Sequence, residues 1–297
     1  MDRTILVTGG TGQLATALAR AAQELPICVV GRPRFDFGRP EAFPDLFAAV
    51  KPHALVNAAA YTAVDAAETD AEAALKANRD GPAELARLCS AARIPLIHIS
   101  TDYVFDGTKG TPYLETDPPA PLGVYGASKL AGEEAVLAVR GQVTILRTSW
   151  VISATGRNFV RSMLAARQNT DRLRVVADQR GRPTAASDLA TAVLAILHNI
   201  ETTGWQEQFG TVFHVAGSGE TTWHGLATAI FEEAGRYGVR PPEIAPIATA
   251  DWPTPARRPA DSRLDCRRID HVFGVRLPPW RASLGAIIDE LLGGSAR

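Results

Sequence analysis

A short apolar strand followed at once by a glycine turn and a helix constrains the fold more than any other part of the sequence. Residues 4–8, Thr-Ile-Leu-Val-Thr, are a continuous run of the kind found in strands buried on both faces of a parallel sheet. Gly9, Gly12 and Ala15 follow with the spacing G-x-x-G-x-x-A, and a helical run begins at Thr16. This order of elements predicts the first unit of a dinucleotide-binding α/β domain.

The small residues of this turn suit a ligand that carries a diphosphate. Gly9 permits the tight turn, and Gly12 lacks the Cβ that would keep a pyrophosphate away from the backbone. Ala15 lets the helix pack closely on the strand. The helix N-terminus then offers unpaired N–H groups to the phosphates. A tight turn that binds no ligand is the alternative, but its position after the first strand favours a cofactor.

Strands and helices alternate through the first half of the chain. Further strands are expected at residues 27–30, 54–60, 96–99 and 143–146, of which 54–60 is expected to be buried. This alternation predicts an α/β fold, a Rossmann-type doubly wound parallel sheet with right-handed crossovers. We expect an NAD(P)-binding domain at residues 1–150 and a smaller α/β substrate domain, mainly residues 151–297. Parts of 173–216 are expected to return to the first domain.

The end of the second strand bears on the choice of cofactor. An acidic residue there would bind a ribose 2′-hydroxyl, whereas an arginine can pair with a 2′-phosphate. Arg32, with Arg34 close by, therefore favours NADPH over NADH, unless both arginines are simply solvated on a loop. Asp36 and Phe37 could border the adenine, by a hydrogen bond and by apolar contact.

Two segments in the middle of the chain resemble one reaction centre. Thr101 follows the strand at 96–99, and Tyr125 and Lys129 lie four residues apart in a helix-favouring segment. An ammonium near the phenol would lower the pKa of Tyr125, so that the phenol could hand a proton to an oxygen gaining negative charge. The Thr101 hydroxyl could hydrogen-bond the same oxygen. Alone, a Tyr and a Lys at this spacing are common on solvated helices, so the interpretation depends on the N-terminal turn.

Composition excludes several other classes of protein. The chain has 297 residues, a formal net charge of −1 and 46% hydrophobic residues, so neither nucleic-acid nor anionic-membrane binding is expected. No apolar stretch approaches the roughly 20 residues that span a bilayer. Its three cysteines are far apart and its six histidines lack metal-ligand spacing, which argues against disulfides and zinc. The start, Met1 to Thr4, has no signal-peptide pattern, and a cytoplasmic protein is expected.

Several longer segments make the resemblance to known proteins specific. With the glycine turn and the Tyr-Lys pair, the chain resembles the dTDP-4-dehydrorhamnose reductases, a family of extended short-chain dehydrogenases/reductases. The matching segments run almost from end to end, at residues 12–14, 57–65, 100–105, 147–151, 158–160, 178–179, 183–184, 253–259 and 262–264.

The resemblance implies a reaction and a role for each central residue. A hydride would pass from NADPH or NADH to the C4 ketone of dTDP-4-dehydro-L-rhamnose, giving dTDP-L-rhamnose. Tyr125 would protonate the forming alkoxide, Lys129 would hold the nicotinamide ribose and depress the tyrosine pKa, and Thr101 would hydrogen-bond the carbonyl oxygen. Preorganised donors of this kind supply a leading part of catalysis in many enzymes.

The resemblance also assigns binding positions. Matches to the family's cofactor contacts are Gly12, Gln13, Leu14, Arg32, Asp36, Phe37, Ala60, Tyr61 and Thr62. Asp102 and Trp150 match substrate contacts, and Trp150 could cover the sugar. The proline- and arginine-rich segment 240–263 predicts a long loop, whose Arg257 and Arg263 could bind the nucleotide diphosphate through paired N–H donors. Solubility of the loop is the alternative explanation for these arginines.

Two departures from the family pattern limit these predictions. Arg32 stands where members commonly carry an acid, which argues against strict use of NADH. Some members form a magnesium-bridged dimer, and Asp289 and Glu290 fit one carboxylate group, but Ser187 replaces a carboxylate of the other. A magnesium ion is therefore doubtful, and both monomer and homodimer stay open.

Two other functions compete with the leading one. A reductase of another dTDP-4-keto sugar, such as a streptose precursor, is the nearest enzyme. A dinucleotide-binding regulatory subunit, like that of methionine adenosyltransferase, needs no turnover. The joint presence of Thr101, Tyr125 and Lys129 argues against the regulatory class.

Overall fold

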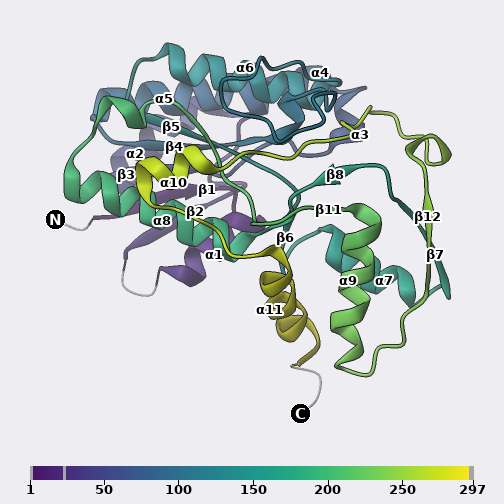
Figure 1. Cartoon of the computed structure of the whole chain (residues 1–297). Coiled ribbons are helices and arrows are strands. Elements are labelled where there is room, and N and C mark those ends of the chain that lie inside the picture. Colours follow the sequence, from purple (N-terminus) through teal and green to yellow (C-terminus); the bar gives the residue numbers. More distant parts are fainter. Residues whose placement is uncertain (1–2, 23–24, 294–297) are drawn as a thin grey trace.

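A parallel sheet of six strands forms the centre of the molecule (Figure 1). The computed structural model describes residues 3–22 and 25–293; Met1 and Asp2, part of the start examined for a signal peptide, lie outside these ranges. The strand order is β10-β5-β4-β3-β1-β2. The strands are β1 (Ile5–Thr8), β2 (Ile27–Val30), β3 (Ala54–Asn57), β4 (Leu96–Thr101), β5 (Val143–Thr148) and β10 (Val212–His214). The predicted Rossmann-type fold is confirmed.

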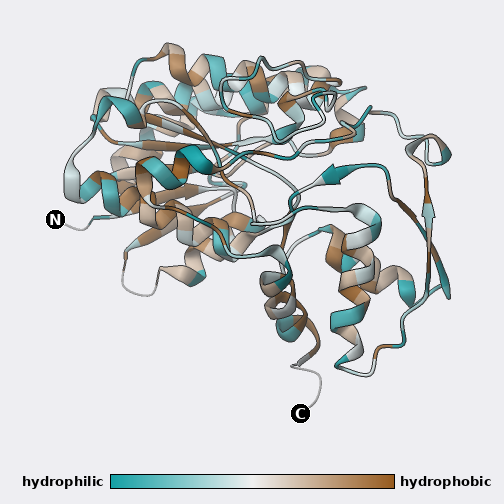
Figure 2. Ribbon diagram, viewed as in Figure 1, coloured by the Kyte–Doolittle hydropathy of each residue, from teal (hydrophilic) through white to brown (hydrophobic). Residues whose placement is uncertain are grey.

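Helices cover both faces of this sheet, as the continuous apolar strands require. One face carries α1 (Gln13–Ala21), α8 (Ala186–Thr203) and α10 (Arg267–Phe273), and the other carries α2 (Phe43–Val50), α5 (Gly81–Ala92) and α6 (Val124–Ala138). In β1, Ile5 and Val7 pack in the core on the α1 side of the sheet, and Leu6 packs in the core on the α5 side. This alternation arises because successive side chains of a strand point to opposite faces. Full burial of each such side chain contributes about 1.5–3 kcal/mol. Figure 2 shows the hydrophobic colour concentrated on these central strands.

Between β3 and α5 the chain runs through short helical pieces. These are α3 (Val64–Ala67), α4 (Ala71–Leu75) and a π-helical turn over Lys76–Asp80. At the first crossover, α1 begins at Gln13, three residues before the expected start at Thr16, because Gly12 is already its N-cap.

The remaining elements form a smaller group beside the large sheet (Figure 1). Its helices α7 (Phe159–Arg167), α9 (Trp223–Gly235) and α11 (Trp280–Leu292) share one hydrophobic cluster. Three small sheets pair β6 (Val151–Ile152) with β9 (Thr184–Ala185), β7 (Arg172–Val176) with β12 (Glu243–Ile247), and β8 (Arg180–Gly181) with β11 (Thr221–Thr222). Two elements that come after residue 150 belong to the large sheet and its cover. Strand β10 pairs with β5 in the sheet, and helix α8 packs on α1. The domain limits stay a prediction.

One secondary-structure prediction is wrong. The segment 240–263 is not a long loop throughout, because β12 lies within it and pairs in parallel with β7. Pro246 argued against a strand here in the sequence, because proline cannot donate a ladder hydrogen bond. The residue is tolerated because the sheet has only two strands, so each is an edge. Within residues 3–22 and 25–293, no helix combines the length and the apolar character that a membrane crossing needs.

Candidate active site

A cavity of about 1360 Å³ lies at the carboxyl ends of the parallel strands. In open α/β sheets this is the edge at which ligands bind. Its lining includes nearly all of the predicted site residues: Gly9, Gly12, Gln13, Leu14, Arg32, Asp36, Phe37, Ala60, Tyr61, Thr62, Thr101, Asp102, Tyr125, Lys129 and Trp150. Residues far apart in the sequence therefore meet in one hollow.

The glycine turn has the shape of a cradle for a diphosphate. Gly9 has a φ of +113°, a conformation that residues with a side chain rarely adopt. A Cβ on Gly12 would lie 3.0 Å from the Gly9 carbonyl oxygen, and one on Gly31 only 2.6 Å from the Cα of Gly10. No side chain caps α1, so N–H groups of its first turn are left for a ligand. The turn fits the cofactor that the sequence predicts.

The end of β2 contributes a charged and an aromatic part of the cavity. Arg32 is exposed and lines the cavity, whereas Arg34 is exposed but is not among the lining residues. The Asp36 carboxylate accepts a hydrogen bond of 2.8 Å from the backbone N–H of Gly38. Phe37 is buried beside it. Arg32 therefore lies where a phosphate in the cavity could meet it, while Asp36 is held by its own loop.

A buried asparagine holds the loop that follows β3. The Asn78 side chain accepts a bond of 2.8 Å from the Tyr61 N–H and donates one of 3.1 Å to the Tyr61 carbonyl. It also donates to Ser128 Oγ on α6, at 2.9 Å. Asn78 therefore fixes Tyr61 against the helix that carries Tyr125. Sequence analysis missed Asn78, because neither the π-helical turn nor the burial of this side chain is visible in the sequence. Such turns are frequent at functional sites.

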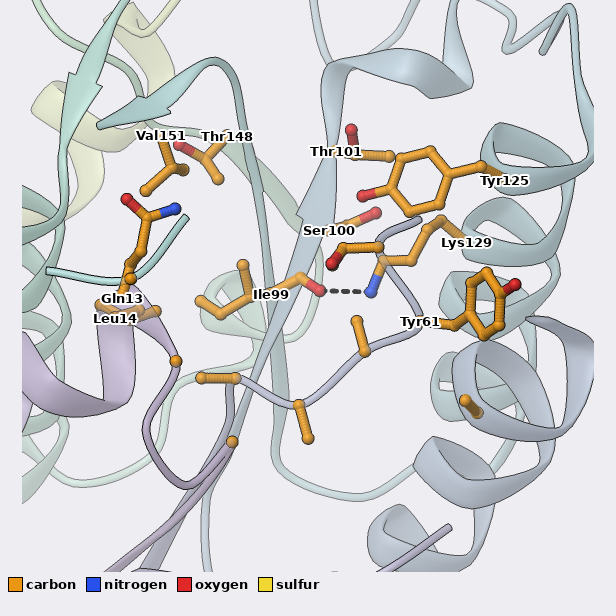
Figure 3. Close-up of a pocket in the computed structure, with 18 of the residues that line it drawn as sticks. Gln13, Leu14, Tyr61, Ile99, Ser100, Thr101, Tyr125, Lys129, Thr148 and Val151 are labelled. Atoms are coloured by element: carbon orange, nitrogen blue, oxygen red, sulfur yellow. Dashed lines mark hydrogen bonds between the residues drawn. The ribbon is translucent and has the colours of Figure 1, made fainter. Parts of the chain in front are cut away.

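The three predicted catalytic residues lie together (Figure 3). Thr101 ends β4, and Tyr125 and Lys129 occupy successive turns at the start of α6. Lys129 Nζ donates a hydrogen bond of 2.7 Å to the carbonyl oxygen of Ile99. Figure 3 shows these residues on one side of the pocket and Gln13, from the first turn of α1, on the other.

The chain is similar to known proteins over nearly its whole length. The family model described as the RmlD substrate binding domain matches residues 3–292. The chain belongs to the RmlD substrate binding domain family. A dTDP-4-dehydrorhamnose reductase from Sinorhizobium fredii is 43% identical over 97% of both chains. A Streptomyces antibioticus protein named probable dTDP-4,6-dihydroxy-2-methyloxan-3-one 4-ketoreductase is 38% identical over 97% of this chain and 95% of its own.

A solved structure extends the similarity to three dimensions. The dTDP-4-dehydrorhamnose reductase of Bacillus anthracis, in complex with NADP, superposes with a TM-score of 0.89. It is 30% identical and covers 98% of this chain and 100% of its own. The predicted resemblance is confirmed.

The electrostatics of this RmlD-family site differ from one expectation. Burial raises the pKa of Tyr125 to about 12; a hydrogen bond with Thr101 opposes the rise, and the charge of Asp102 adds to it. The expectation that Lys129 lowers the pKa of Tyr125 is wrong for this structure. The reason is geometric, because the ammonium is turned toward the Ile99 carbonyl.

A buried ion pair stands behind Lys129. Burial lowers the pKa of Lys129 to about 8, and the carboxylate of Glu133, one turn along α6, opposes the change. Glu133 accepts hydrogen bonds from Ser100 Oγ at 2.5 Å, Arg147 Nε at 2.9 Å and Arg147 Nη2 at 2.6 Å. Ser100 and Arg147 are register partners in β4 and β5, so one carboxylate ties two strands to α6, the helix that carries Tyr125 and Lys129. In the sequence, the position of Glu133 four residues after Lys129 was the one indication that a carboxylate lies near the ammonium.

Asp102 is buried at the cavity wall. Burial raises its pKa to about 7, although hydrogen bonds from Ser262 and Thr101 oppose the rise. Within the described ranges, its Oδ2 atom has no hydrogen-bond partner. This is an acceptor that remains for a ligand hydroxyl.

The structure does not bring Arg257 and Arg263 into the cavity. Arg263 is buried and donates to Asp261, to Glu220 at 2.7 Å and to the Gly110 carbonyl at 2.9 Å. Arg257 is exposed and borders a small neighbouring hollow, which shares Tyr103 and Tyr125 with the wall of the cavity. Arg258, in the same loop, pairs with Asp65 at 2.8 Å and fastens the loop to α3.

No metal centre is evident in residues 3–22 and 25–293, where no group of three or more His, Cys, Asp or Glu side chains could hold an ion. Both C-terminal carboxylates considered for magnesium have other partners. Asp289 pairs with Arg236 at 2.5 Å, and Glu290 pairs with Arg20 at 2.6 Å.

Proposed function

We propose that this protein is an NADPH-dependent reductase that converts the C4 ketone of dTDP-4-dehydro-L-rhamnose into the alcohol of dTDP-L-rhamnose. The observation that carries the proposal is the convergence of Thr101, Tyr125 and Lys129 on the cavity that begins at the glycine turn. It is supported by the relatives from Sinorhizobium fredii and Bacillus anthracis, which bear the name of this reductase, the latter in complex with NADP.

The cofactor would be held by elements of the first domain. The turn at Gly9 and Gly12 and the first turn of α1 would bind its diphosphate, and Arg32 would pair with a 2′-phosphate. When bound, NADPH supplies the hydride that the ketone carbon receives.

Tyr125 would donate the proton. Its raised pKa means that the phenol holds its proton at neutral pH, as a general acid must before the reaction. The Thr101 hydroxyl donates to Asp102 Oδ1 at 3.2 Å in this structure. On substrate binding it would turn its proton to the ketone oxygen and stabilise the charge that develops there. The Lys129 ammonium, which lines the same cavity, would hold the ribose of the cofactor's nicotinamide half.

The sugar nucleotide would lie beyond the catalytic trio. The free Oδ2 atom of Asp102 supports a contact with a sugar hydroxyl, and Trp150 borders the same part of the cavity. We retain Arg257 as a candidate for the diphosphate. Arg263, whose donors are occupied, is the weaker one.

A reductase of another dTDP-4-keto sugar is the second candidate. It is favoured by the Streptomyces antibioticus relative, whose name describes a 4-ketoreductase of a different dTDP sugar. A panel of dTDP-4-keto sugars, compared by kcat/KM, separates the two candidates.

Consumption of NADPH, followed by absorbance, tests the proposal. Wild-type protein should oxidise NADPH only when dTDP-4-dehydro-L-rhamnose is present. Tyr125→Phe removes the donor and should lower kcat by about 10²–10⁴-fold with the Kd for NADPH unchanged. Tyr237→Phe, on the exposed surface near Asp289, is the matched control and should leave kcat unaltered. Wild type without turnover would favour a regulatory subunit, and faster turnover of another keto sugar would favour the second candidate.

A further inference from the structure

Two tryptophans are stacked against each other at the wall of the cavity. The indole rings of Trp150 and Trp223 have centroids 3.6 Å apart and planes inclined by 7°. Both residues line the cavity. Trp150 comes two residues after Thr148, the register partner of Thr101, and both threonines line the same cavity.

The backbone of Trp150 is held in an unusual conformation. Its φ is +46°, in the left-handed region that bulky residues rarely adopt. Such conformations persist where the surroundings determine them, and they cluster at functional sites.

The two broad faces of Trp150 are both covered. Trp223 covers one. On the other, a Cβ added to Gly181 would lie 2.2 Å from Cε2 and 2.6 Å from both Cζ2 and Nε1, distances that place it above the ring plane. Trp150 therefore presents an edge to the cavity. It cannot lay a face over the sugar, which differs from the covering role that the resemblance implied.

The indole of Trp223 is itself held in place by a hydrogen bond and by an aromatic contact. Its Nε1 donates to Gln179 Oε1 at 3.1 Å, and Gln179 Nε2 donates to Thr249 Oγ1 at 3.0 Å. Phe159 packs on Trp223 with ring centroids 4.7 Å apart. The one polar atom of Trp223 is thus committed, and what it offers to the cavity is carbon.

We propose that Trp223 is a specificity-determining residue of the sugar site, whose edge, stacked with that of Trp150, forms an apolar wall for the methyl group of a 6-deoxy-4-keto sugar. The inference rests on the proposed function, because it concerns the same cavity. A hydroxymethyl group at this wall would bring a hydroxyl that loses water and gains no partner from Trp223. Apolar pockets reject such an added hydroxyl by up to about 10²-fold.

Binding of a matched pair of ligands tests the proposal without requiring turnover. The sugars of dTDP-L-rhamnose and dTDP-L-mannose differ only by the C6 hydroxyl. Titration calorimetry in the presence of NADP⁺ should show that wild type prefers the rhamnose compound by about 10–100-fold. Trp223→Ala should reduce the preference to within about threefold, and Trp223→Phe, which keeps an aromatic carbon edge, should retain most of it.

Two further variants make the result specific. Gly181→Ala displaces Trp150 from the other side and should also reduce the preference, while Trp252→Ala, an exposed tryptophan outside the cavity lining, should leave it as in wild type. Thermal melting identifies any variant that fails to fold, and Gly181→Ala then replaces Trp223→Ala as the deciding variant.

An unchanged preference in the folded variants, equal weakening of both ligands, or a wild type that does not distinguish them overturns the proposal. Failure of wild type to consume NADPH overturns the proposed reductase function instead, and leaves the binding preference measurable.

Discussion

Replacing Glu133 by alanine should destabilise the fold strongly, because it leaves a buried arginine without its counter-ion. The side chains of Glu133 and Arg147 are 3% and 4% exposed. Arg147 Nη1 already has no hydrogen-bond partner among the described residues. The guanidinium rests on the Phe105 ring, 5.1 Å from its centroid, and the variant supplies no other acceptor.

The magnitude follows from the hydrogen bonds that the Glu133 carboxylate accepts. Three of them come from Arg147, whose Nε–H is shared between the two carboxylate oxygens, and one comes from Ser100. Each hydrogen bond to a charged group contributes about 1.5–3 kcal/mol, but water entering the space returns part of this sum. Breaking a buried pair by removing one partner costs about 3–5 kcal/mol. We therefore expect the free energy of unfolding to decrease by this amount. At roughly 2 °C per kcal/mol for a large domain, Tm should fall by about 6–10 °C.

Urea unfolding followed by circular dichroism measures the free energy directly. Glu134→Ala, at the exposed neighbouring position, is the control and should change stability by less than about 0.5 kcal/mol. Glu133→Leu combined with Arg147→Met removes both charges and should restore most of the loss. The reasoning is refuted if Glu133→Ala is as stable as Glu134→Ala, or if the double variant is no more stable than the single one.

Three further predictions concern the site and its surroundings. Above pH about 8, kcat/KM should decrease, because Lys129, with its pKa lowered to about 8, loses its charge there while Tyr125, with its pKa near 12, keeps its proton; a pH profile with no alkaline limb below pH 10.5 contradicts this. Arg32→Asp should shift the ratio of kcat/KM from NADPH toward NADH, and an unchanged ratio would mean that Arg32 does not meet the ribose. Arg263→Met should lower the urea midpoint, because it unpairs the buried Asp261, yet leave the Kd for dTDP unchanged; a weaker Kd at unaltered stability would restore Arg263 to the substrate site.

Much of the fold could be predicted because its signals are local. The run from Ile5 to Val7 is apolar on both faces, which only a strand between two helical layers can use. Gly9 and Gly12 specify the turn that follows, because a side chain would be strained at Gly9 and crowded at Gly12. These properties belong to neighbouring residues, so the sequence displays them directly.

The gathering of Thr101, Tyr125 and Lys129 at one cavity could also be predicted, but their pKa values and side-chain directions could not. Parallel strands bring their carboxyl ends to one edge, which places Thr101 near Tyr125 and Lys129. The direction of the Lys129 side chain depends on the Ile99 carbonyl, 30 positions away, and the pKa of Tyr125 depends on how many atoms surround it. Neither quantity is written in a spacing of four residues.

The sequence by itself determined the architecture, the glycine turn and which three residues, Thr101, Tyr125 and Lys129, meet at the cavity. Tertiary structure alone decided that Arg263 is an internal counter-ion, that Glu133 ties two strands to a helix, and that Trp223, 73 positions beyond Trp150, lies against it. The physical reason is range. Backbone conformation answers to adjacent residues, whereas the partner of a buried charge or ring is whichever side chain the completed packing brings within a few ångströms.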